Sequence, residues 1–141
     1  MSVSLKRVYE SPSGTDGVRV LVDRLWPRGL TKEAAAVDLW LKEIAPSNEL
    51  RRWYHERPTM WTQFREKYLR ELRSDAASAA LDELYALAAQ EKHVTLLFAS
   101  KDAERNNAVV LKELLDGLKK PPRSTGPERA VATAKAARAR R

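Results

Sequence analysis

The chain contains no cysteine, only five glycines and only two histidines in 141 residues. The absence of cysteine excludes a disulfide scaffold, a thiolate nucleophile and a cysteine-ligated zinc or iron–sulfur site. Neither His55 nor His93 has a second ligand at the spacing of a metal motif, so we expect no metal site and no cofactor. The glycine-rich phosphate loop and the GxSxG and HExxH motifs are also missing, so the main hydrolase, kinase and dinucleotide-binding signatures are absent.

Long hydrophobic runs are absent too. The longest stretch of apolar residues, 84–89, has six members, so no helix is expected to span a membrane. The N-terminal segment 1–7 lacks the apolar core of a secretion signal, and we therefore expect a cytoplasmic protein. Hydrophobic residues make up 43% of the chain and charged residues 32%, which is typical of a globular domain and not of a disordered chain.

The net charge of +7 is unevenly distributed along the chain. Residues 119–141 contain eight of the 26 lysines and arginines but only one of the 19 acidic residues, which leaves 18 residues of each sign in 1–118. Three prolines and a glycine fall within 119–127, where they prevent a helix from continuing. We therefore predict a neutral domain, 1–118, followed by a basic tail, 119–141, that is mostly disordered.

Residues 1–118 alternate between strand-like and helical patterns. Strands are predicted at 3–9, 18–22 and 93–99, where β-branched and large apolar residues gather. Amphipathic spacing predicts helices at 59–73, 76–90 and 105–116, and shorter helical pieces at 31–36, 38–44 and 47–53. This order predicts a small, helix-rich α/β layered fold with a short and at least partly parallel sheet. The almost continuous apolar character of 93–99 further predicts helices on both faces of that sheet.

Polar residues follow two of the predicted strands. In open α/β sheets, ligands bind beyond the carboxyl ends of the strands, so the two polar groups form one candidate site if strands 18–22 and 93–99 are neighbours. Arginine and lysine side chains there suit a phosphate or carboxylate, and the aspartates are candidate general acids or bases, or Mg²⁺ ligands beside a phosphate. The candidates are Asp23, Arg24 and Arg28 after the first strand, and Lys101, Asp102 and Asn107 after the second.

A structural interpretation of the same residues stays open. Asp23 and Arg24 can form an ion pair that fixes their loop, and Asp102 can cap the last helix. Similarly, Trp26 either lines the pocket or packs within its loop. Lys42, Glu43 and Ser47 form a further polar group, for which an exposed helical pair and a helix cap are the simpler interpretation.

Several motifs resemble the YeaO-like family of small bacterial proteins, a domain of unknown function numbered 488. The resemblance covers about residues 4–116 and rests on KRVY at 6–9, DGVRVLVDRLWPRG at 16–29, WLKEIAPS at 40–47, LR at 50–51, TLLFASKD at 95–102 and Asn107. It implies an α/β cytoplasmic domain without an established activity. The family motif falls on Asp23, Arg24, Trp26, Arg28, Lys42, Glu43, Ser47, Lys101, Asp102 and Asn107. Arg105 departs from the family, which often has histidine at this position.

Two functions from different classes follow from these features, and neither requires a membrane. The first is a domain that binds, or binds and acts on, a small phosphate- or nucleotide-like anion, with Asp23 and Asp102 as acid or base. The alternative is a nucleic-acid-associated protein that binds without sequence preference through its tail, 119–141. A third hypothesis is an interaction module that uses an apolar patch near Trp26 and Trp53.

Overall fold

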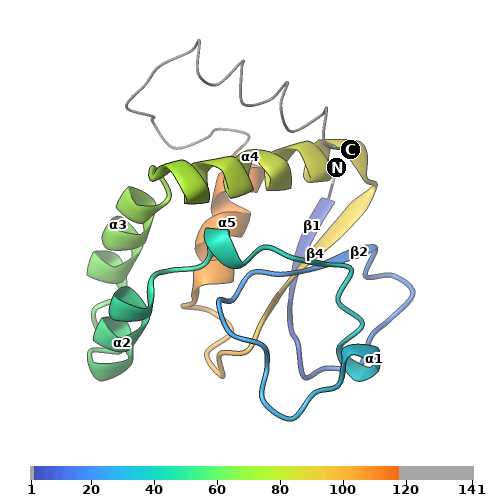
Figure 1. Ribbon diagram of the computed structural model, residues 1–141, viewed down its shortest axis with the longest axis horizontal. Helices are drawn as coiled ribbons and strands as arrows, with labels where there is room; N and C mark the ends of the chain where they lie inside the picture. Colours follow the sequence, from blue (N-terminus) through green and yellow to red (C-terminus); the bar gives the residue numbers. More distant parts are fainter. Residues whose placement is uncertain (1, 118–141) are drawn as a thin grey trace.

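The computed structural model describes residues 2–117, which form a four-stranded sheet with helices packed mainly against one face (Figure 1). All strand pairs are parallel, and the order across the sheet is β1–β4–β2–β3. The α/β fold and the parallel sheet predicted from the sequence are confirmed, whereas the predicted tail lies outside the described residues. The strands are β1 (Ser2–Arg7), β2 (Val18–Leu21), β3 (Leu39–Trp40) and β4 (His93–Phe98).

Residues 2–117 also contain five α-helices and one 3₁₀ turn, all between β2 and β4 except the last helix, which follows β4. The helices are α1 (Lys32–Ala35), α2 (Asn48–Glu56), α3 (Trp61–Glu71), α4 (Asp75–Gln90) and α5 (Asn107–Asp116), and the 3₁₀ turn is η1 (Lys42–Ile44). Ser47 caps α2 as the sequence predicted, because its Oγ accepts from Leu50 N. Thr31 caps α1 in the same way, because its Oγ1 accepts from Ala34 N. No helix in this range is long and apolar enough to cross a bilayer.

The helical segment predicted at 38–44 is wrong. Leu39 and Trp40 instead form β3, which pairs with the end of β2, and only Lys42–Ile44 is helical. Pairing with β2 at the sheet edge gives the backbone N–H and C=O groups of this segment hydrogen-bond partners that a single helical turn would not provide. The tertiary contact therefore outweighs the local helical preference.

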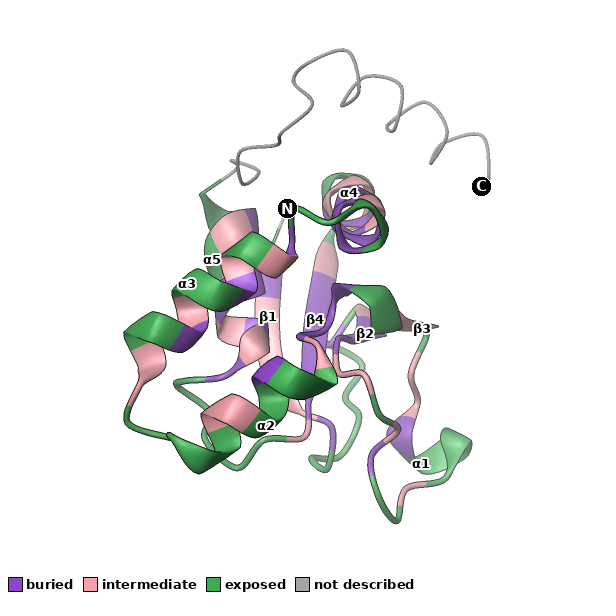
Figure 2. Ribbon diagram, turned by 60° about the vertical axis from the view of Figure 1, so that its left-hand side comes forward, coloured by how far each residue is buried: buried purple, intermediate pink, exposed green. Residues whose placement is uncertain are grey.

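Alternate residues of β4 point to two very different environments. Val94, Leu96 and Phe98 enter the main core beneath α3, α4 and α5. Leu97 faces the other way, into a small cluster with Val8, Leu21 and Ala35. Figure 2 shows the buried central strand between the α4–α5 side and the loops around α1. The prediction of helices on both faces is therefore only partly right, since one turn of helix and loops cover the second face.

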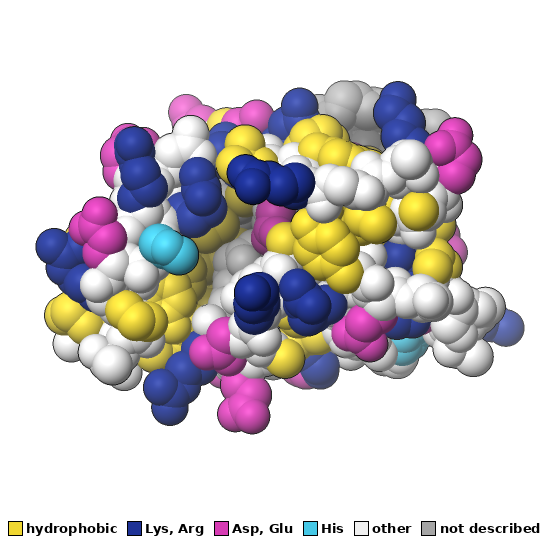
Figure 3. Space-filling view, turned by 90° about the horizontal axis from the view of Figure 1, so that it is seen from below, with side chains coloured by type: hydrophobic (Ala, Val, Ile, Leu, Met, Phe, Trp, Pro, Cys, Tyr) yellow, Lys and Arg dark blue, Asp and Glu magenta, His cyan; other side chains and the backbone are white. Residues whose placement is uncertain are grey.

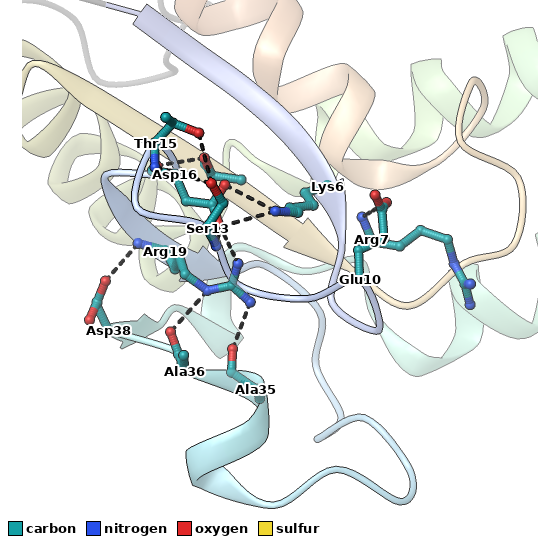
Figure 4. Close-up of polar contacts among 11 residues, drawn as sticks. Lys6, Arg7, Glu10, Ser13, Thr15, Asp16, Arg19, Ala35, Ala36 and Asp38 are labelled. Atoms are coloured by element: carbon teal, nitrogen blue, oxygen red, sulfur yellow. Dashed lines mark hydrogen bonds and ion pairs between the residues drawn. The ribbon is translucent and has the colours of Figure 1, made fainter.

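A buried charged network occupies that second face beside the start of β2 (Figure 4). Arg19 Nη1 lies 2.6 Å from Asp16 Oδ2, and Lys6 Nζ lies 3.1 Å from Asp16 Oδ1. The same guanidinium group donates to the carbonyl oxygens of Ala35 and Ala36. The network thus joins β1, the loop before β2 and the end of α1.

Candidate functional site

Asp23 links the ends of two neighbouring strands. β2 and β4 are adjacent and parallel, so both strand ends reach the same edge of the sheet, as the sequence hypothesis required. Asp23 Oδ2 accepts from Ala99 N at 2.8 Å, and Asp23 Oδ1 accepts from Asn107 Nδ2 at 3.1 Å. Asn107 Nδ2 also donates to Val22 O at 2.9 Å. The structure therefore brings Asp23 and Asn107 into direct contact and anchors the first turn of α5 to the strand ends.

Burial raises the pKa of the Asp23 carboxyl above its ordinary value. The hydrogen bonds from Ala99 and Asn107 and the positive charge of Arg51 oppose this effect without cancelling it. Asp23 forms no ion pair within residues 2–117, so its charge is balanced mainly by neutral donors.

Arg24 does not pair with Asp23, contrary to the structural interpretation of the sequence. Its side chain crosses to the segment before α2, where Nη2 donates to Ala45 O at 3.1 Å and Nε donates to Pro46 O at 3.3 Å. Arg24 therefore fixes the path of the chain between η1 and α2.

Asp102 does not cap α5. Its Oδ1 atom accepts from the backbone N–H groups of Glu104 and Arg105, within the loop after β4. The cap of α5 is Asn106, whose Oδ1 atom accepts from Val109 N at 3.1 Å. Asp102 therefore forms an Asx-type turn with its own loop, and Asn106, which directly precedes α5, serves as the cap of that helix.

Trp26 packs within its loop. Its Nε1 atom donates to Leu30 O at 2.7 Å, and its ring meets Trp40 edge-on with 5.4 Å between ring centroids. Trp40 Nε1 in turn donates to Asp23 O at 2.7 Å, and Lys42 Nζ lies 4.2 Å from the centroid of the Trp40 ring. The two tryptophans thus support the backbone of Asp23 from the second face of the sheet.

Exposed cations surround the strand ends. Arg28 follows β2, Lys101 follows β4, Arg105 precedes α5, and the charge of Arg51 in α2 acts on Asp23. None of the four forms an ion pair with another described residue. Figure 3 shows this end of the molecule, where basic side chains gather around a hollow with apolar walls.

Three of the predicted residues line a separate cleft of about 270 Å³ between the 43–47 segment and the α3–α4 corner. They are Arg24, Glu43 and Ser47. Ser47 Oγ donates to Glu71 Oε2 at 2.6 Å, and Ser47 N donates to Glu71 Oε1 at 2.8 Å. Sequence reasoning missed Glu71, because it lies 24 positions from Ser47 in an unrelated helix and no spacing pattern connects them.

Tyr68 forms the inner wall of this cleft. Its hydroxyl group is fully buried and donates to Ile44 O at 2.5 Å. Burial and the nearby negative charges of Asp23 and Glu71 raise the pKa of the Tyr68 hydroxyl far above its ordinary range. Tyr68 lies in the helix predicted at 59–73, and the amphipathic spacing of that helix gave no indication of this polar contact.

The predicted residues therefore fall into two places. Asp23 and Asn107 lie at the strand ends with the exposed Arg28, Lys101 and Asp102, whereas Arg24, Glu43 and Ser47 line the cleft, with Lys42 beside it on Trp40. Within the described residues, no three His, Asp or Glu side chains converge as a metal site would require.

Comparison with known proteins identifies relatives. A family model for DUF488-N3i, described as an inactive DUF488-N3 subclade, matches residues 2–130. The chain is 42% identical to the uncharacterised protein YeaO of Escherichia coli K12 over 118 residues, which is 84% of this chain and 100% of the relative. It is 43% identical to an uncharacterised protein of Mycobacterium tuberculosis H37Rv over 115 residues, 82% of this chain and 94% of the relative. The search of solved structures found no significant match.

These matches confirm the resemblance that the sequence motifs indicated. The family match also extends past residue 118, although the motifs themselves ended at about residue 116. Part of the predicted tail therefore falls within the matched range.

Proposed function

The chain belongs to the DUF488-N3i family, an inactive subclade, and from this membership and the strand-end geometry we propose that it binds a small phosphate-bearing anion without turning it over. The observation that carries the proposal is the group of cations around the strand ends. Arg28, Arg51, Lys101 and Arg105 have no acidic partner among residues 2–117, although they stand where α/β sheets bind their ligands.

Phosphate is the anion class that best suits this arrangement. Guanidinium groups bind phosphate oxygens through paired N–H donors, and lysine adds a compact charge. The strand ends offer several cations on separate elements, the loops after β2 and β4 and the helix α2, which can approach a phosphate from different sides.

Binding without turnover agrees with how the two candidate acid–base residues are held. Both Asp23 oxygens accept hydrogen bonds, from Ala99 and Asn107, and Asp102 Oδ1 accepts two from its own loop. We propose that these carboxylates fix the loops that carry the cations. A catalytic role for either aspartate stays a prediction of the sequence.

Thermal unfolding of the full chain with inorganic phosphate and pyrophosphate tests the proposal. Potassium chloride at matched ionic strength is the control for salt effects. An anion at 100 times its dissociation constant stabilises the fold by about 2.7 kcal/mol, and we expect this shift to be lost in Lys101→Gln and Arg51→Gln.

Lys92→Gln is the matched control, because Lys92 is exposed and precedes β4 at the opposite end of the strand from Lys101. We expect Lys92→Gln to keep the phosphate shift. If neither anion raises the unfolding temperature, or if Lys92→Gln loses the shift equally, the strand ends are not the anion site.

The alternative function, binding of nucleic acid without sequence preference, is supported by the charge distribution alone. Residues 1–118 are neutral, so the whole net charge of +7 lies in 119–141. If most of the eight basic residues contact phosphates, the slope of log affinity against log salt approaches roughly −5 to −7. A full chain with all eight replaced by glutamine loses this slope, whereas an unchanged slope would contradict tail binding.

A further inference from the structure

Two large hydrophobic side chains are strongly exposed within residues 2–117, and both lie at the strand ends. Tyr9, which follows β1, is 42% exposed, and Leu25, which follows β2, is 56% exposed. Since β1, β4 and β2 are parallel neighbours, the segments after them reach the same edge of the sheet, where Arg28 and Lys101 also lie. Figure 3 shows apolar side chains between the basic ones on this face. The cations of the proposed phosphate site therefore have apolar neighbours.

The Tyr9 ring is held in a fixed orientation. Its hydroxyl group donates to Arg28 O at 2.9 Å, and the guanidinium carbon of Arg7 lies over the ring, 5.1 Å from its centroid. Arg7 itself donates from Nε to Ser100 O at 2.9 Å and from Nη2 to Ala99 O at 3.0 Å. The ring is thus tied to the loops after β2 and β4. One of its faces is covered by a cation, and the exposed part of the ring is open to a ligand.

An exposed aromatic ring among cations without acidic partners suits a ligand that carries both a flat ring system and a phosphate. Nucleotide bases stack on tyrosine rings, while arginine and lysine bind the phosphate. A ring that is already oriented loses little conformational freedom when a base stacks on it. We propose that the strand ends bind a nucleoside monophosphate, with its base stacked on Tyr9 and its phosphate held by Arg28 and Lys101. This proposal rests on the phosphate binding proposed above.

The single exposed ring favours a free nucleotide over a nucleic-acid strand. Proteins that bind single strands stack successive bases on several aromatic side chains and follow the backbone with a basic groove. Among the tyrosines, tryptophans and phenylalanines of residues 2–117, Tyr9 is the one that is strongly exposed, and all four tryptophans are partly buried. The strand ends therefore offer a stacking platform for one base.

Calorimetric titration of the full chain with AMP and with ribose 5-phosphate tests the proposal, because the two ligands share the phosphate and differ in the base. We expect AMP to bind about 5- to 150-fold more tightly, the effect of stacking one base on one aromatic ring. Tyr9→Ala should lower the affinity for AMP to that for ribose 5-phosphate and leave the latter unchanged. Equal affinity of the wild type for the two ligands would overturn the proposal.

Two further variants separate the Tyr9 ring from its surroundings. Tyr9→Phe removes the hydroxyl group that donates to Arg28 O but keeps the ring, so it should keep the preference for AMP. Leu25→Ala removes the other exposed apolar side chain and no ring, so it should keep the preference as well. If either variant loses as much of the preference as Tyr9→Ala does, stacking on Tyr9 is not its cause.

Inorganic phosphate separates failure of this proposal from failure of phosphate binding itself. If inorganic phosphate and ribose 5-phosphate bind but AMP binds no more tightly, the phosphate site stands and the contact with the base is wrong. If none of the three binds, both proposals are wrong. A short oligoadenylate tests the alternative of a strand. A larger loss of affinity for it than for AMP on Tyr9→Ala would overturn the free nucleotide in favour of a single strand.

Discussion

Two aspartates flank β2, and their negative charges are balanced in different ways. Asp16, before the strand, is buried and would have a raised pKa from burial alone. Hydrogen bonds from Ser13 N, Lys6 and Arg19, and the charge of Lys6, outweigh burial and lower the pKa of Asp16. At Asp23, after the strand, burial outweighs the neutral donors and raises the pKa.

This difference indicates what each end of β2 contributes. At Asp16, both cations of the network are used to neutralise one carboxylate and to hold the end of α1, so the cluster is a closed structural unit. Around Asp23, the nearby cation Arg51 shifts its pKa without pairing with it, and Arg28 and Lys101 are also unpaired within 2–117. Cations that have no ion-pair partner at the ends of parallel strands are available to bind an anionic ligand.

The largest loss of stability is expected when the ion-pair network of Lys6, Asp16 and Arg19 is broken. Asp16→Asn leaves the Arg19 guanidinium buried beside a neutral amide, and loss of one partner of a buried ion pair costs about 3–5 kcal/mol. Urea denaturation measures this loss in the free energy of unfolding. Glu33→Gln, an exposed change on α1, is the control and should stay within about 0.5 kcal/mol of the wild type. A loss below ~1 kcal/mol for Asp16→Asn would mean that the network does not stabilise the fold.

A smaller effect is expected at the other end of the strand. Asp23→Asn retains one oxygen acceptor but turns an NH₂ group toward either Ala99 N–H or the Asn107 amide. One lost hydrogen bond costs about 1–2 kcal/mol, partly offset because a neutral group is easier to bury than a charge. The same denaturation series measures it. A loss as large as that of Asp16→Asn would remove the distinction between the two ends.

The sequence predicted that strands 18–22 and 93–99 could end side by side, but not that the predicted site residues fall into two separate places. Segments 18–22 and 93–99 are rich in apolar and β-branched residues, and such central parallel strands are identifiable without long-range information. Asp23 was identified because it directly follows the predicted strand 18–22, and Asn107 because it belongs to the polar residues after the predicted strand 93–99. Their positions follow from topology, which the order of strands and helices indicates.

The remaining site features depend on contacts between distant segments. Arg24 donates to the carbonyl groups of Ala45 and Pro46 and not to the adjacent Asp23, and Glu71, in another helix, accepts from Ser47. No sequence spacing predicts such contacts. The short β3 was also missed, because two residues that pair at a sheet edge have no periodicity of their own.

The smallest expected effect, the pH dependence of the two variants, is the most direct test of the comparison. Asp16 has its pKa below the ordinary value of 3.8, so its ionised form contributes stability above that pH, and this contribution is lost as the pH falls through the folded-state value. The deficit in unfolding free energy of Asp16→Asn relative to the wild type should therefore shrink on acidification below about pH 4.

Asp23 has its pKa above 3.8, so the wild type loses stability as the pH rises from about 4 to the raised value. The deficit of Asp23→Asn should consequently be largest in acid and smaller at neutral pH. Unfolding free energies measured for the three proteins between pH 3 and pH 7 give both slopes, and slopes of the same sign would contradict the opposite electrostatic balance at the two ends of β2.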